Sequence, residues 1–99
     1  MDFIDIHGAS GTAYRFRPWP PSGAHPPIAG NYALVPAGAK TPVELGVLDD
    51  LSQALAVLSR APGAMLFTRF NVSRRAREAE HADMTLHHPE LNSATTHAA

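Results

Sequence analysis

The sequence predicts an α+β domain, in which a three-stranded antiparallel sheet carries two packed helices and is preceded by an N-terminal β-hairpin. Short apolar segments of strand length are separated by turns rich in glycine and proline. Two further segments begin with helix-capping residues and end at glycine or proline. The link between the two central strands is short, which favours an antiparallel pair.

Residues 1–19 are typical of a β-hairpin, because two apolar-rich segments flank a turn at 8–11. The second segment alternates aromatic residues with arginines: Tyr14, Arg15, Phe16, Arg17 and Trp19. Five prolines between positions 18 and 27 exclude a helix or a central strand, so residues 20–29 are predicted to be a connector. The hairpin is therefore expected to be an addition that either extends the sheet or mediates a homodimer.

Residues 30–92 are predicted to form the main unit, with strands at 30–35, 43–48 and 64–70. Asp50 opens the first helix with a capping sequence, and the apolar stripe of that helix is Leu51, Leu55 and Leu58. Ser73 is predicted to cap the second helix, whose apolar stripe is Val72, Ala76, Ala79 and Leu86. Pro89 ends this helix, and residues 93–99 are expected to be a flexible tail.

The composition excludes several classes of protein. The 99 residues carry a formal net charge of -1, so any contact with nucleic acid needs a local basic patch. Cysteine is absent, which excludes disulfides and thiolate metal sites. No apolar run approaches about 20 residues, and the acidic first residues are unlike a signal peptide. We therefore expect a cytoplasmic protein that does not enter a membrane.

Five features of the main unit occur in an order that resembles the GIY-YIG nuclease family. Residues 30–32 (Gly-Asn-Tyr) stand where the first triplet of that family lies, and residues 44–46 (Glu-Leu-Gly) stand where the second lies. Leu51 keeps the spacing of the helix leucine. Glu80 keeps the spacing of the family's glutamate from a Pro-x-x-Asn ending, which residues 89–92 match. The resemblance does not account for the hairpin.

The resemblance implies hydrolysis of a phosphodiester with one Mg²⁺ or Mn²⁺ ion. Glu80 would then be the metal ligand, because divalent cations of this kind prefer oxygen donors. Tyr32 would position or deprotonate the nucleophile, and Asn92 would complete the matching set. We expect Tyr32 and Glu80 to face one groove.

Two positions depart from the family pattern. The second tyrosine is replaced by Glu44, whose carboxylate would repel a phosphate unless a metal lies between them. The helix arginine is replaced by Ala54, and the loss of such a donor typically costs about 2.7–4 kcal/mol of transition-state stabilisation. The leading interpretation is therefore a degenerate GIY-YIG-like domain that acts as a nucleic-acid-binding or interaction module, with DNA as the candidate partner and with little or no catalysis.

Two alternatives stay open. One is a metal-dependent endonuclease that uses Tyr32 and Glu80 with a remodelled set of partners. The other is a protein-interaction domain whose contact surface is the aromatic hairpin. For the leading interpretation, the predicted nucleic-acid surface consists of four arginines: Arg69, Arg74, Arg75 and Arg77. The same arginines would also suit a solvated face balanced by nearby glutamates.

Three residues of the main unit also have plainer explanations. Tyr32 is compatible with an ordinary amphipathic strand position, and Glu80 with a solvated helix rim. Asp83 falls inside the apolar stripe of the second helix, where a carboxylate needs a partner or a wet cavity. We expect an arginine partner or a shifted helix face, rather than an acidic pocket with Glu80 and Glu44. The histidines near the chain end are too poorly placed to share a metal.

Overall fold

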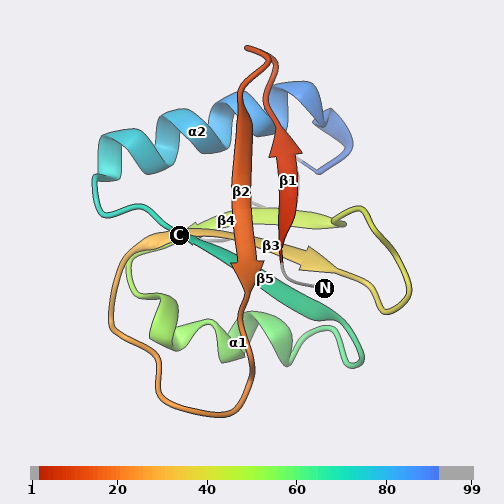
Figure 1. Cartoon of the computed structure of the whole chain (residues 1–99), viewed down its shortest axis with the longest axis vertical. Helices are drawn as coiled ribbons and strands as arrows, with labels where there is room; N and C mark the ends of the chain where they lie inside the picture. Colours follow the sequence, from red (N-terminus) through yellow and green to blue (C-terminus); the bar gives the residue numbers. More distant parts are fainter. Residues whose placement is uncertain (1–2, 92–99) are drawn as a thin grey trace.

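A curled antiparallel sheet of five strands forms the middle layer of the computed structural model, which describes residues 3–91 (Figure 1). The strands, in their order across the sheet, are β1 (Ile4–His7), β2 (Ala13–Pro18), β5 (Met65–Phe70), β3 (Gly30–Val35) and β4 (Glu44–Leu48). All neighbouring strands are antiparallel. The α+β class is confirmed, and the predicted count of three strands is wrong.

The hairpin accounts for the two additional strands, because it extends the sheet. Arg17 and Pro18 at the end of β2 pair with Thr68 and Phe67 of β5. The hairpin also contributes to the core, since Phe16 is fully buried. Its inward side chains pack with residues of β3, β4 and β5 in one apolar cluster. The hairpin is therefore an integral part of the fold.

The sheet separates two apolar cores, because neighbouring residues of a strand point to opposite faces. Helix α2 (Arg74–His87) covers the first core, which includes Phe16, Ala33, Val35, Leu45, Phe67 and Met84. Helix α1 (Leu55–Leu58) covers the second core, which includes Trp19, Tyr32, Leu34, Ala54, Val57 and Leu66. We call these two sides of the sheet the α2 face and the α1 face.

The first predicted helix is a 3₁₀ turn, η1 (Leu51–Gln53), followed by the single turn of α1. The cap at Asp50 is confirmed, since its carboxylate accepts a hydrogen bond from the Ser52 amide at 2.9 Å. The predicted stripe is wrong in part, because Leu55 is exposed and Ala54 is buried. A 3₁₀ turn has three residues per turn, so the buried positions recur at intervals of three: Leu51, Ala54 and Val57.

Helix α2 begins at the predicted cap, where the Ser73 hydroxyl accepts a hydrogen bond from the Ala76 amide. Its predicted apolar stripe is wrong, because Val72 and Leu86 are 74% and 73% exposed. The helix turns Arg77 toward the sheet instead, and this side chain is only 6% exposed. None of the helices in residues 3–91 combines the length and the apolar character needed to cross a membrane.

The side chain of Asp83 connects helix α2 to the hairpin through hydrogen bonds. Its carboxylate accepts hydrogen bonds from the Ser10 amide at 2.9 Å, the Ser10 hydroxyl at 2.6 Å and the Tyr14 hydroxyl at 2.7 Å. Of the two expectations for Asp83, the arginine partner is wrong, since hairpin donors satisfy this carboxylate, and the shifted helix face is confirmed, since the buried residues of α2 are Arg77, Met84 and Thr85. Gly8 lies directly against it, and a Cβ at that position would collide with the carboxylate.

Replacement of Asp83 by Asn is expected to lower the free energy of unfolding at neutral pH, because an amide cannot accept all three hydrogen bonds. Hydrogen bonds from Ser10 and Tyr14 hold the pKa of Asp83 below its ordinary value of 3.8. Its contribution is therefore present above about pH 4 and is lost as the pH falls through the lowered pKa. Denaturant unfolding of the parent and Asp83→Asn should differ more at pH 7 than at an acidic pH below the lowered pKa of Asp83. An equal difference at both pH values would contradict this account.

Candidate nucleic-acid interface

The structure does not bring together the residues predicted for catalysis. Tyr32 points to the α1 face and is 2% exposed, whereas Glu80 lies on α2 and binds Arg69 at 2.9 Å. The two side chains are on opposite sides of the sheet, so the expectation of a shared groove is wrong. The reason is topological, because the chain passes to the other face between β5 and α2. Asn92 lies outside the described residues.

Tyr32 and Glu44 form a buried hydrogen-bonded pair, to which the exposed Arg60 also binds. Its hydroxyl donates to the Glu44 carboxylate at 2.6 Å, and Arg60 donates to the same carboxylate at 2.9 Å. Burial, together with the hydrogen bond to Glu44, raises the pKa of Tyr32 well above its ordinary range. The Tyr32 hydroxyl is thus held protonated, which makes it a poor base. Glu44 is neutralised by Arg60 rather than left free beside a phosphate.

The two glycines of the triplets have a packing explanation. At Gly30, a Cβ would collide with the backbone carbonyl of Arg69 and with the Leu51 side chain. At Gly46, a Cβ would collide with the ring of Tyr32. Close packing between neighbouring strands, and between a strand and a tyrosine ring, therefore accounts for glycine at both positions.

The four predicted arginines have different environments. Arg77 is buried, and its guanidinium donates to the Asn71 and Val72 carbonyls and to Asp49. This arginine therefore has a structural role in the fold. Arg74 is exposed and pairs with Glu78 in the next turn of α2, and Arg75 is exposed. Of the four, only Arg69 contributes to the cleft described below.

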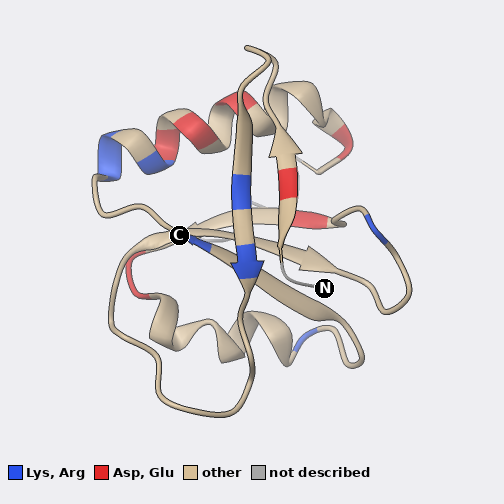
Figure 2. Cartoon of the chain, viewed as in Figure 1, with Lys and Arg blue, Asp and Glu red and all other residues tan. Residues whose placement is uncertain are grey.

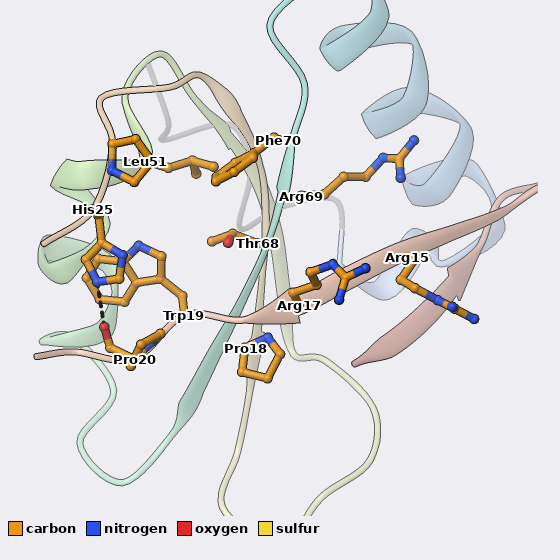
Figure 3. A pocket seen from close by; sticks show the side chains of 11 residues that line it. Arg15, Arg17, Pro18, Trp19, Pro20, His25, Leu51, Thr68, Arg69 and Phe70 are labelled. Atoms are coloured by element: carbon orange, nitrogen blue, oxygen red, sulfur yellow. Dashed lines mark hydrogen bonds between the residues drawn. The ribbon is translucent and has the colours of Figure 1, made fainter. Parts of the chain in front are cut away.

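A cleft of about 400 Å³ opens on the α1 face, where β2 leaves the sheet and the proline-rich segment begins. It is lined by residues of β2, the proline-rich segment, η1 and β5: Arg15, Arg17, Pro18, Trp19, Pro20, His25, Pro26, Leu51, Thr68, Arg69 and Phe70. Figure 3 shows Trp19 and His25 on one side of the cleft and the three arginines on the other. Of these residues, only Arg69 was predicted as part of the nucleic-acid surface, and only Trp19 belongs to the aromatic hairpin that was considered as a protein-interaction surface.

Strand register explains why the cleft combines arginine with aromatic rings. Arg17 is paired with Thr68, so both side chains project from the α1 face. Helix α1 covers the part of this face around Tyr32, and it leaves Phe70 60% exposed at the end of β5. Arginine side chains and aromatic rings therefore lie close together on the part of the α1 face that helix α1 does not cover.

Trp19 forms the most buried wall of the cleft. Its indole ring is 6% exposed and stacks on the His25 ring, with ring centroids 4.1 Å apart and an interplanar angle of 16°. His25 is held in turn by a 2.7 Å hydrogen bond from its Nε2 to the Pro20 carbonyl oxygen. The Trp19 Nε1 atom is buried and finds no acceptor among residues 3–91. An unsatisfied donor thus lies in the wall of the cleft.

Every charged residue that lines the cleft is an arginine, and no acidic side chain lines it. Figure 2 likewise shows basic positions and no acidic ones along β2. Arg15 binds Asp5 at 3.0 Å, and Arg69 binds Glu80. Arg17 makes no ion pair with any other residue in the described range. Arg17 therefore supplies the one uncompensated cation of the described cleft.

No protein-family model, curated protein or solved structure matches the chain. Within residues 3–91, no three histidine, aspartate or glutamate side chains gather into a group that could hold a metal ion. The cleft is therefore the candidate site with the clearest chemistry. Its guanidinium groups suit phosphate oxygens, and its flat rings suit the faces of nucleobases.

Proposed function

We propose that this chain is a nucleic-acid-binding module that contacts its ligand through the cleft at the end of β2. The observation that carries the proposal is the combination of arginines and aromatic rings in a cleft without acidic residues. Arg17 would contact a phosphate, and Trp19, His25 and Phe70 would contact bases. Such pairing of a basic groove with aromatic platforms is typical of proteins that bind nucleic acid.

The combination of arginines with the exposed ring of Phe70 favours nucleotides over a ligand that offers carboxylates alone. Carboxylates would satisfy the arginines, but they would leave the exposed ring of Phe70 without a matching group. Nucleotides present an anionic phosphate and a flat base side by side. Because the whole chain has a net charge of -1, binding is expected to depend on this local patch and to weaken as the salt concentration rises, with a slope that reflects few phosphate contacts.

The proposed module binds without cleaving. Two placements support this part of the proposal: the Tyr32 hydroxyl is engaged by Glu44, and Glu80 lies across the sheet from it. Ala54 is buried in the second core and offers no charge to a phosphate. We therefore expect no metal-dependent cleavage with Mg²⁺ or Mn²⁺.

Arg17→Ala is expected to weaken binding and to flatten its salt dependence. Loss of one phosphate contact should reduce the slope of log affinity against log salt by about 0.7–0.9. The measurement is fluorescence anisotropy with a labelled, unstructured oligonucleotide over a range of salt concentrations. Arg74→Ala is the matched control, because it removes the same charge from an exposed arginine outside the cleft.

Two outcomes would contradict the proposed function. One is the absence of binding by the parent protein to any DNA or RNA at low salt. The other is an equal change of slope in Arg17→Ala and Arg74→Ala, which would show that the cleft has no particular role.

A further inference from the structure

We infer that the cleft receives one unpaired nucleobase between Phe70 and the stacked Trp19–His25 pair, and that the module therefore binds single strands in preference to duplexes. This inference rests on the proposed function and names the class of nucleic acid that the same site takes. Three features of the cleft carry it: its walls, its unsatisfied indole donor and its size.

The walls of the cleft are aromatic and belong to separate segments. Phe70 is the last residue of β5, and the Trp19–His25 pair spans the proline-rich segment after β2. Figure 3 shows Thr68 lying between them. A base in a duplex is stacked on its neighbours and presents only its edges, whereas an unpaired base can stack its faces on aromatic rings. The aromatic rings on the walls of the cleft therefore favour binding of an unpaired base over a base in a duplex.

The indole nitrogen of Trp19 is the second, independent observation. It is buried in the cleft wall and has no acceptor among residues 3–91, although a buried donor is normally paired. Every nucleobase carries acceptors on its edge, so a bound base can supply the missing partner. The His25 ring covers the indole through one stacking contact and one hydrogen bond to Pro20.

The size and the rim of the cleft suit one nucleotide. A volume of about 400 Å³ lies at the lower end of the range for small-molecule sites, which suits a single nucleotide better than a base pair. Arg17 lies at the rim without an acidic partner in the described range, so it can bind the phosphate next to an inserted base.

Trp19 is the only tryptophan in the chain, so its fluorescence reports directly on the cleft. The experiment titrates the full chain with a short single strand, an abasic strand of the same length and the corresponding duplex. The single strand should quench Trp19 emission and bind about ten- to a hundred-fold more tightly than the abasic strand. The duplex should bind no better than the abasic strand and should leave the emission unchanged.

Variants of Phe70 separate stacking from electrostatics. Phe70→Leu should lose affinity for the normal strand and keep the weaker affinity for the abasic strand. Phe70→Tyr retains the ring and should bind both strands like the parent. Phe70 is largely exposed, so neither variant is expected to unfold the protein.

The outcomes distinguish the inference from the proposed function. Equal affinity for all three ligands with unchanged Trp19 emission would overturn base insertion, and a cleft-specific salt effect in Arg17→Ala would still support nucleic-acid binding. The absence of binding to any of the three ligands at low salt would overturn both.

Discussion

Phe16→Ala is expected to lower the free energy of unfolding by about 3–5 kcal/mol, the usual cost of deleting a fully buried phenyl ring. Phe16 has no exposed surface and packs with side chains from both ends of the sequence. A domain of this length has a total stability of about 5–15 kcal/mol, so the variant should be close to unfolded. The effect is large because the hairpin is part of the main core.

Denaturant unfolding followed by Trp19 fluorescence and by far-ultraviolet circular dichroism measures this effect. The first signal reports on the end of the hairpin and the second on the whole chain, and their transitions should coincide. Phe70→Ala is the matched control, because it deletes the same ring from an exposed position and should change stability little. Separate transitions, or an effect of Phe16→Ala confined to the fluorescence signal, would show that the hairpin folds independently.

Glu44→Ala is expected to lower the free energy of unfolding by about 1–3 kcal/mol, because it leaves the buried Tyr32 hydroxyl without its acceptor. Glu44 is 8% exposed, so water cannot readily replace the carboxylate. Tyr32→Phe alone should cost less, since Glu44 keeps its ion pair with Arg60. The double variant Tyr32→Phe with Glu44→Ala should regain part of the loss.

Denaturant unfolding of the parent, Tyr32→Phe, Glu44→Ala and the double variant forms a double-mutant cycle. It tests whether Tyr32 and Glu44 stabilise the fold through their interaction. A non-additive pair would show that Tyr32 and Glu44 stabilise each other in the fold. Strictly additive effects, with no loss in Glu44→Ala, would contradict the burial and the hydrogen bond on which the account depends.

Local signals made much of the fold predictable. The strands at 30–35, 43–48 and 64–70 were placed within one residue of β3, β4 and β5, because each is bounded by proline or glycine. Ser73 and Asp50 were correct caps because a cap depends on a few neighbouring residues. The buried faces of the two helical segments were less predictable. The first begins with the 3₁₀ turn η1, which changes the spacing of its buried residues. The second, α2, buries Arg77 against the sheet in place of the expected apolar stripe.

The candidate site could not be predicted because long-range pairing creates it. Alternation in β2 indicates that arginines and aromatic residues occupy opposite faces, but it does not indicate which face is buried. Tyr14 and Phe16 are buried in the core on the α2 face and Trp19 in the core on the α1 face, so the aromatic hairpin does not offer the outward contact surface considered from the sequence. The alternating arginines, Arg15 and Arg17, line the cleft instead.

The separation of Tyr32 from Glu80 has the same physical origin. Spacing along the sequence placed both on suitable elements, but only the packing of α2 decides which face of the sheet Glu80 meets. Glu80 pairs with Arg69, whose side chain lies on the α2 side near Tyr14. A linear pattern of residues therefore does not establish a shared groove.

Nuclear magnetic resonance mapping of a single-stranded oligonucleotide on the labelled protein tests the central claim most directly. We predict that the amide and side-chain signals that shift belong to Arg17, Trp19, His25, Thr68 and Phe70, and that the signal of the Trp19 indole N–H shifts most. Shifts confined to Arg74 and Arg75 on α2, or no shifts at low salt, would contradict binding in the cleft.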